Sequence, residues 1–461
     1  MNVRTHKHVL VVAYAFWPVN VVGAIRPLRL SAELLGRGYR VTVLAMEPWD
    51  EELNDQGFGR DIAEQVQIER VRFRWPIGLL RKIRRTTLSR LDSLEAKQAS
   101  KKALDSMLRW YLGALNALLL YAINLMVSLT WTVSIVSRGW RIARADHIDC
   151  VFCTAPPNSS LLPASVLAWL IDAPMVADFR DLWTLHEYAH PGSSGVWKSL
   201  SHRINEFLER FVLRCSKFII YNTPTAKTLM DEKHPSCAEK AFAITNGISP
   251  EGGHYPKDRK ANGCFTICHL GTLYNDRNPS DFLKGLRQWL DSKGVEFENK
   301  VSVTFVGRGS DEVERAAHKY GLENVVRAYG HKTREELPEI LGNADVFLLC
   351  LGYREASRYV IPAKMYDYIG AEKPVIAFAP TDGEVFNLMR RLGLAANVVT
   401  SPDSARVTAI LEQEYQRCTS NGNQYSVPHV LRQEYDYSTV SQRIERVISL
   451  AIEGHASRKG A

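Results

Sequence analysis

The sequence lacks several patterns that would assign a chemistry at once. It contains no Asp-x-Asp pair. Such a pair is a common way to hold a divalent cation on a nucleotide, so we expect no carboxylate-bound metal. It also has no short repeat and no low-complexity tract, and its composition of 46% hydrophobic and 23% charged residues excludes a disordered, collagenous or mainly membrane-embedded chain. A length of 461 residues predicts two or three globular domains.

Cysteine patterns of the zinc or disulfide type are also missing. The eight cysteines are scattered, and the one C-x-x-C pair, Cys150 and Cys153, has no second pair or histidine pair beside it. That pair lies in a short apolar run, which favours buried strand cysteines over a metal or redox site. The apolar run His8–Phe16 is followed by no small-residue cleavage site, so a secretory signal is not expected and a reducing compartment fits best.

Positive charge is present, but it is local. The chain has a net charge of +8, and the stretch Arg70–Arg109 alone holds twelve Lys or Arg against three Asp or Glu, which leaves the rest close to neutral. A local basic run indicates an anionic surface as partner. Nucleic acid is not expected, because no nucleic-acid-binding motif accompanies the run.

An uncharged segment of 28 residues, Trp110–Ser137, follows the basic run. As one helix it is long enough to span a bilayer core of about 30 Å. A simple span is not expected, because the strands before and after it belong to one predicted sheet. A re-entrant hairpin, an interfacial helix and a buried helix remain open. Its aromatic residues resemble interfacial anchors, and the basic run Arg81–Arg85 suits anionic head groups. The aromatic residues are Trp110, Tyr111, Tyr121 and Trp131 within the segment and Trp140 just after it.

Short apolar runs alternate with helical patterns along the chain, which predicts an α/β fold with parallel sheets and helical crossovers. A stretch rich in Gly, Pro, Lys and Asp interrupts this pattern and is predicted to be a linker. The same alternation follows it, so we expect two doubly wound halves. The predicted divisions are an N-terminal domain at 1–245 with an insertion at about 76–145, a linker at 246–264, a C-terminal domain at 265–430, and a return helix and tail at 431–461.

Ligands of open α/β sheets bind at the carboxyl ends of the strands. After the first predicted strand, Gly23 opens a helix that carries Arg26 in its first turn, where a cation opposes the helix dipole and suits an anionic ligand. After the predicted strand Met175–Ala177, two carboxylates, a guanidinium and an imidazole lie within nine residues, which marks a candidate site or a structural ion pair. These residues are Asp178, Arg180, Asp181 and His186.

The second half has its own candidates at strand ends. Glycines allow close backbone approach to a phosphate, a lysine in the first turn of a helix can meet a diphosphate, and a carboxylate can accept a ribose hydroxyl. An exposed i,i+3 salt pair is the structural alternative for the last two. The residues are Gly271, Arg277, Gly307, Arg308, Lys364 and Asp367.

Together these blocks resemble family-4 glycosyltransferases of the GT-B fold, in particular the branch that builds bacterial cell-surface polysaccharides. The likeness covers about His8 to Val399. Its motifs are Asp178–Trp183, Ala243–Ile248, His269–Arg277, Phe305–Gly309, Tyr329–Leu341, Ala344–Leu349 and Ile361–Ala377.

The resemblance implies two facing Rossmann-like domains, with a nucleotide sugar bound by the C-terminal one and the acceptor by the N-terminal one. It implies that Gly23 lies by the donor, Arg277 faces its diphosphate and Asp367 contacts its ribose, with no metal and no other cofactor. The sequence departs from the family where Tyr359 replaces the first acid of the family's E-x7-E motif and Thr272 replaces an arginine. Lys364 and Arg308 are candidates to replace that charge.

The resulting prediction is a retaining hexosyl- or N-acetylhexosaminyl-transferase that uses a nucleotide sugar, UDP-sugars first, and a polyprenyl-diphosphate-linked acceptor. Asp181 and His186 are the candidates for positioning or deprotonating the acceptor hydroxyl, and Arg26, Asp178 and Arg180 for binding acceptor or phosphate. The basic and uncharged segments predict attachment to anionic lipid at the cytoplasmic face of the inner membrane. A nucleotide-sugar epimerase and a non-catalytic membrane scaffold remain alternatives.

Overall fold

The computed structural model describes residues 6–48, 54–57, 59–72, 86, 126–185, 196–248, 263–273, 277–307, 309–330, 332, 336–420 and 425–459. Most of the basic run and the first part of the uncharged segment lie outside these residues, as do His186, Arg308 and most of the predicted linker. The chain forms two compact units, Met1–Ile220 with Glu445–Ala461, and Tyr221–Ile444.

The first sheet has seven strands in the order β3-β2-β1-β4-β5-β6-β7. Neighbouring strands from β3 to β5 pair in parallel, as the alternating pattern predicts. The strands are β1 (His8–Ala13), β2 (Arg40–Met46), β3 (Gln67–Val71), β4 (Cys150–Ala155), β5 (Met175–Phe179), β6 (Phe218–Tyr221) and β7 (Ala241–Ala243). The helices are α1 (Val22–Gly36), α2 (Arg60–Ala63), α5 (Leu161–Leu170), α6 (Val196–Cys215) and α7 (Pro224–Lys233), and residues 126–145 are also helical.

The second sheet has six strands in the order β10-β9-β8-β11-β12-β13, and every neighbouring pair is parallel. The strands are β8 (Phe265–Leu270), β9 (Val301–Val306), β10 (Val326–Tyr329), β11 (Val346–Cys350), β12 (Val375–Phe378) and β13 (Val398–Val399). The helices are α8 (Ser280–Lys293), α9 (Ser310–Lys319), α10 (Leu337–Gly342), α11 (Ala363–Gly370), α12 (Glu384–Arg391), α13 (Ser404–Ser420), α14 (His429–Glu434) and α15 (Tyr437–Lys459).

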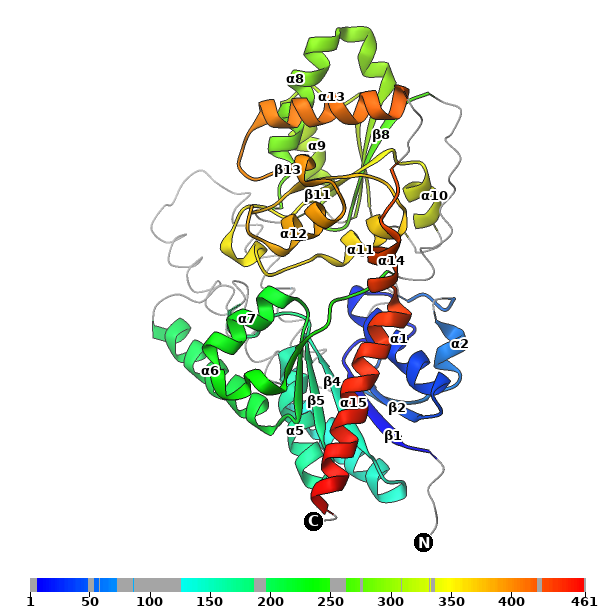
Figure 1. Cartoon of the computed structure of the whole chain (residues 1–461), viewed down its shortest axis with the longest axis vertical. Coiled ribbons are helices and arrows are strands. Elements are labelled where there is room, and N and C mark those ends of the chain that lie inside the picture. The colour runs from blue at the N-terminus through cyan, green and yellow to red at the C-terminus, as the bar shows by residue number, and fades with distance from the viewer. Residues whose placement is uncertain are drawn as a thin grey trace. The chain divides into compact units, whose positions relative to one another are not determined.

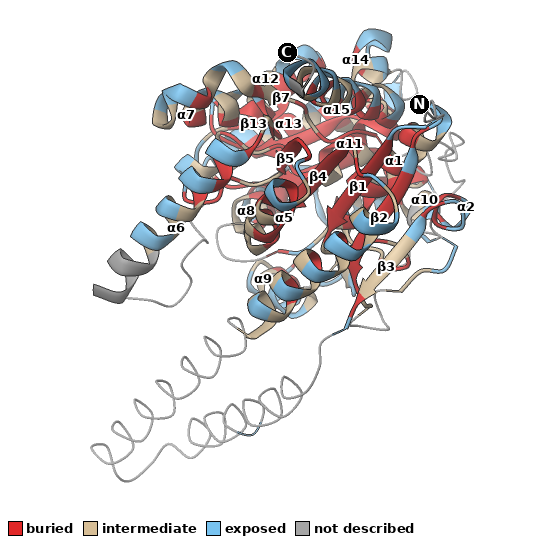
Figure 2. Cartoon of the chain, turned by 90° about the horizontal axis from the view of Figure 1, so that it is seen from below, coloured by how far each residue is buried: buried red, intermediate tan, exposed pale blue. Residues whose placement is uncertain are grey.

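Both sheets are therefore doubly wound, and the α/β class with two Rossmann-like halves is confirmed. The central strands are buried on both faces, as the red strands of Figure 2 show, because helices cover both sides of a parallel sheet. Cys150 and Cys153 are buried in β4 and free, which confirms their interpretation as strand cysteines.

The C-terminal helix α15 starts in the second unit, and its last part belongs to the first. There Tyr39 donates a hydrogen bond of 2.7 Å to Glu445, and His455 Nε2 lies 3.0 Å from the Asp172 carbonyl oxygen. Figure 1 shows this red helix along the first unit. Helix α15 lies within the stretch 431–461 that is predicted as return helix and tail.

The helical residues 126–145 correct one expectation about the uncharged segment. Trp131 is fully buried, its indole donates to Ser160 Oγ at 2.8 Å, and its ring packs edge-on against Tyr14. An added Cβ at Gly139 would meet Leu167 of α5 at 2.2 Å, so this helix packs closely on α5 within the first unit. Trp131 is therefore a core residue and not an interfacial anchor. Among the residues that the structure describes, no helix has both the length and the apolar character needed to cross a bilayer.

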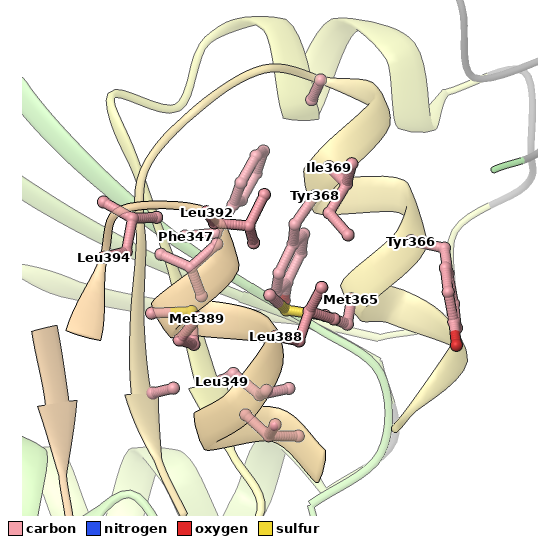
Figure 3. Close-up of a cluster of buried hydrophobic side chains, with 14 of the residues drawn as sticks. Phe347, Leu349, Met365, Tyr366, Tyr368, Ile369, Leu388, Met389, Leu392 and Leu394 are labelled. Carbon is pink, nitrogen blue, oxygen red and sulfur yellow. The ribbon is translucent and has the colours of Figure 1, made fainter. Parts of the chain in front are cut away.

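In the second unit, a hydrophobic cluster fixes helix α11 against the sheet. Tyr368 stacks on Phe347 of β11 with ring centroids 4.3 Å apart, and Met365 and Ile369 are buried beside them (Figure 3). The Tyr368 hydroxyl accepts from the Leu270 amide at 2.9 Å and donates to the Leu348 carbonyl at 3.2 Å. These contacts hold the first turn of α11 beside the end of β8.

Candidate functional site

Asp178 lies inside β5 and is fully buried, where it binds a cation from the distant helix α1. Arg26 donates two hydrogen bonds to its carboxylate, from Nε at 3.0 Å and from Nη2 at 2.8 Å. Thr154 of β4 donates a third at 2.7 Å. A buried charge is tolerated when it is paired and hydrogen-bonded, and this fork geometry satisfies both groups.

This pair changes how Arg26 is interpreted. Its side chain is 1% exposed, and both carboxylate oxygens already accept from it. The cation that opposes the α1 dipole therefore has an internal counter-ion. The assignment of Arg26 and Asp178 to an acceptor or phosphate stays a prediction, while their structural pairing is plain.

Arg180 lies just past β5 and faces the first turn of α1. Its Nε donates to the Ala155 carbonyl at 3.1 Å and its Nη2 to the Pro156 carbonyl at 2.8 Å. An added Cβ at Gly23 would lie 3.0 Å from Arg180 Nη1, so the absence of a side chain at Gly23 lets the guanidinium approach the helix N-terminus. The structure thus brings Gly23 and Arg180 together at the carboxyl edge of the first sheet.

Asp181 follows in a loop that helix α6 holds in place. Glu209 of α6 is buried and accepts hydrogen bonds from the Thr184 amide at 3.1 Å and the Thr184 hydroxyl at 2.9 Å. Trp183 donates to Asn205 of the same helix at 3.1 Å. Asp181 is partly exposed at the end of β5, which is a suitable place for a group that acts on a substrate hydroxyl.

The second unit places two glycines against each other at the ends of β8 and β9. Gly271 has φ +96° and Gly307 has φ +139°, a region that residues with side chains rarely adopt. An added Cβ at Gly307 would lie 2.6 Å from the carbonyl carbon and oxygen of Gly271. The backbone segments at the ends of β8 and β9 therefore pack tightly against each other, and the approach of a phosphate to these glycines stays a prediction.

Lys364 of α11 lies over this glycine pair. Its ammonium would be 3.0 Å from a Cβ at Gly271, and it lies 3.1 Å from Nε2 of His269 in β8. The pKa of Lys364 is lowered to about 8, mainly by burial and also by the Arg277 charge, while Cys350 and Asp367 oppose the shift. Arg277 and Asp367 thus act electrostatically on the same ammonium, so five predicted donor residues gather here: Gly271, Arg277, Gly307, Lys364 and Asp367.

Two helix N-termini lie near these strand ends, and their charges differ. The first turn of α9 carries Asp311 and Glu312, which already complement the positive end of its dipole and would repel a phosphate. The first turn of α11 contains no acid and carries Lys364. An anionic ligand is therefore favoured at α11 over α9.

Sequence reasoning missed two participants. His269 lies in a quoted motif but received no role, although a histidine at the end of an apolar run beside a glycine is an unusual signal. Thr154 carries no signal at all, because only the register between β4 and β5 brings it opposite Asp178. In the described part of the chain, no three His, Cys, Asp or Glu side chains converge to hold a metal ion.

Comparison with known protein families gives two matches that cover most of the chain. Residues 23–247 match the glycosyl transferase 4-like domain, and residues 255–385 match glycosyl transferases group 1. A comparison with curated protein sequences finds no match.

Solved structures similar to this chain share its architecture at low identity. The α,α-trehalose 6-phosphate synthase of Burkholderia multivorans has a TM-score of 0.59 and 11% identity over 97% of this chain and 99% of its own. The lipopolysaccharide outer core galactosyltransferase WaaB has a TM-score of 0.55 and 11% identity over 96% and 99%. A UDP-N-acetylglucosamine 2-epimerase has a TM-score of 0.50 and 12% identity over 95% and 94%.

At such identities the structural likeness establishes the fold, which transferases and an epimerase share, while the two family models specify glycosyl transfer. With its two doubly wound halves matching the two models in order, the chain belongs to the family-4-like glycosyltransferases of the GT-B fold.

Proposed function

We propose that this glycosyltransferase moves a sugar from a nucleotide sugar, UDP-sugars first, to a polyprenyl-diphosphate-linked saccharide in bacterial surface polysaccharide synthesis, with retention of configuration. The observation that carries the donor assignment is the Lys364 ammonium beside the Gly271–Gly307 pair. This cation lies at the carboxyl edge of the second sheet, where open α/β sheets bind their ligands.

The donor half supplies what the leaving group needs. As the glycosidic bond breaks, negative charge grows on the diphosphate, and fixed positive groups lower the energy of that state. Lys364, Arg277 and the N-terminus of α11 are proposed to provide them without a metal. Asp367, three residues after Lys364 on α11, is the candidate for a ribose hydroxyl.

The acceptor half supplies groups that can orient a hydroxyl. Asp181 is the proposed base, because its loop is fixed by Glu209 while its carboxylate keeps contact with solvent. Arg180 beside the α1 N-terminus is the proposed phosphate contact. His186 and Arg308 lie outside the described residues and keep their predicted roles.

A membrane-bound acceptor is supported by exposed apolar side chains on the first unit. Ile204 and Phe207 of α6 are 51% and 68% exposed, and Leu129 and Val133 in the helix at 126–145 are 55% and 65% exposed. Apolar side chains held at a surface mark protein or membrane contacts. Similarity to a lipopolysaccharide galactosyltransferase agrees with a lipid-linked acceptor at the cytoplasmic face of the inner membrane.

The decisive experiment measures nucleoside diphosphate release from a panel of UDP-, GDP- and TDP-sugars, with and without bacterial lipid extract containing polyprenyl-diphosphate saccharides. We expect release from one donor that depends on the extract, and a retained anomer by NMR. Isomerised nucleotide sugar without extract would replace the proposal by an epimerase, and nucleotide binding with no turnover of any donor would favour a non-catalytic scaffold.

A second experiment tests the membrane contact by sedimentation with vesicles of phosphatidylglycerol and phosphatidylethanolamine. Neutralising Arg81, Lys82, Arg84 and Arg85 should weaken binding to the vesicles by roughly 1 kcal/mol per basic residue. Nucleotide binding should not change. The matched control removes four exposed cations of the second unit, Lys284, Lys300, Arg315 and Lys319. Equal losses in the two variants would reduce the effect to net charge and contradict a dedicated surface.

A further inference from the structure

His269 is a buried imidazole at the end of a strand, and both of its nitrogens have partners. Its Nδ1 lies 2.9 Å from the Leu348 carbonyl oxygen of the neighbouring strand β11, and its Nε2 lies 3.1 Å from the Lys364 ammonium. The residue is 0% exposed. Nothing in the sequence motifs or the family match gives this histidine a task.

The two partners settle its tautomer. A carbonyl oxygen can only accept a hydrogen bond, so Nδ1 carries the proton and donates it to Leu348. An ammonium group can only donate, so Nε2 presents its lone pair to Lys364. Protonation would place a second N–H against the ammonium. Burial, and then the Lys364 charge, accordingly lower the pKa of His269 well below its usual value.

The surroundings also fix the direction of the ring. Its centroid lies 5.5 Å from that of Phe305 in β9, at an angle of 38°. Gly271 leaves the space through which the Lys364 side chain passes, because any Cβ there would lie 3.1 Å from its Cε. A lysine carries about 2 kcal/mol of rotamer entropy, and a fixed acceptor at its end selects one of its many conformations.

We infer that His269 is a positioning residue for the donor diphosphate: it holds the Lys364 ammonium beside Gly271 through a neutral acceptor, so that the whole positive charge stays available to the phosphates. A carboxylate in its place would hold the lysine equally well but would cancel the charge. This inference rests on the proposed donor role of Lys364.

The test compares His269→Phe with the parent in calorimetric titrations of UDP, GDP and TDP and of the corresponding nucleosides. Phenylalanine keeps the size and removes the acceptor. We expect the diphosphate that binds the parent to bind the variant about 10-fold more weakly, which is about 1.4 kcal/mol, with nucleoside affinity changed less than twofold. Equal weakening of both ligands would indicate a purely structural role, and an unchanged diphosphate affinity would also overturn the inference.

A double-mutant cycle with Lys364→Ala separates positioning from direct contact. Because His269 acts through Lys364, the double variant should bind the diphosphate as weakly as Lys364→Ala alone, and additive losses would contradict the mechanism. His269→Gln, whose amide oxygen can accept from the ammonium, should recover part of the affinity. Failure to recover any of it in a folded variant would count against an acceptor role.

The matched control is His8→Phe. His8 is another buried strand histidine, whose Nε2 lies 2.9 Å from Thr42 Oγ1 in the first unit. The His8→Phe variant should have a lower melting temperature than the parent and the same ratio of diphosphate to nucleoside affinity. If the parent itself binds none of the three diphosphates, the donor proposal fails, whereas a binding parent with an unaffected His269→Phe variant overturns this inference alone.

Discussion

Each unit of the molecule places a cation near the carboxyl edge of its sheet, but the two cations have different partners. In the first unit, Arg26 is buried against the carboxylate of Asp178, which also accepts from Thr154. In the second, Lys364 meets the neutral ring of His269. A carboxylate partner makes an internal ion pair that ties helix to strand, whereas a neutral partner leaves a net charge for a ligand. Arg26 therefore forms an internal ion pair in the first unit, whereas Lys364 in the second is the cation proposed to bind the donor diphosphate.

The largest effect should follow from breaking the first pair. Asp178→Ala leaves the Arg26 guanidinium buried without a counter-ion, and such losses cost about 3–5 kcal/mol. We expect that drop in the free energy of unfolding of the first unit, measured by urea denaturation. Asp181→Ala, three residues later in a partly exposed loop, is the control and should change stability by less than about 0.5 kcal/mol. Equal effects would remove the distinction between the two aspartates.

The same kind of truncation in the second unit should affect binding and not stability. Lys364→Ala removes a charged hydrogen-bond donor worth about 1.5–3 kcal/mol, so nucleoside diphosphate affinity should fall roughly 10- to 150-fold. Stability should change by less than about 1 kcal/mol, because the lost ammonium was itself costly to bury. Titration calorimetry and urea denaturation on one preparation test both statements. A large loss of stability with intact binding would reverse the comparison.

Glycine substitutions give a second comparison between the two units. At Gly307 a Cβ would meet the Gly271 backbone at 2.6 Å, and φ is +139°, so Gly307→Ala should lose about 1–3 kcal/mol of stability and much of the diphosphate affinity. At Gly23 the nearest atom is the end of the Arg180 side chain at 3.0 Å, which can move. Gly23→Ala should therefore cost less than about 1 kcal/mol in thermal unfolding. The opposite order would show that the α1 turn is the more rigid one.

The smallest effect is a pH dependence of the second site. With a pKa of about 8, the Lys364 ammonium loses its proton above that pH, and His269, Cys350, Arg277 and Asp367 are the groups that face it. Diphosphate affinity should fall roughly tenfold between pH 7 and 9. The native state binds fewer protons than the unfolded state between about pH 8 and the usual lysine value of 10.5, so this group makes stability rise with pH across that window. Lys364→Arg should abolish the fall in affinity, and an unchanged profile would exclude Lys364 as its source.

The local apolar pattern of the sequence predicts some strands correctly and misses others. The apolar runs Phe265–Leu270, Val301–Val306 and Val375–Phe378, each closed by a turn, predict three buried strands, and the structure has β8, β9 and β12 at these bounds. Strand β3, with Glu69 and Arg70 in its middle, and the two-residue β13 escaped prediction, because edge strands need little apolar sequence. Strand β5 continues through Asp178 instead of ending before it, because Arg26, from 152 residues away, neutralises the carboxylate.

The uncharged segment shows the limit of composition. Trp131 has the sequence context of a membrane anchor, yet it is buried against Ser160 and Tyr14. An indole suits either setting, since its ring is apolar and its N–H needs one acceptor. Only the packing of the helix at 126–145 on α5 decides between them.

By itself, the sequence determined two doubly wound halves, the glycines and cations at their strand ends, and the family to which their order belongs. These features follow from periodicity, from backbone freedom and from charge, which are properties of neighbouring residues. The tertiary structure decided which cation is neutralised and which is kept charged. That choice depends on contacts between residues far apart in the chain, Arg26 with Asp178 and Lys364 with His269, and burial makes each contact strong enough to set the charge.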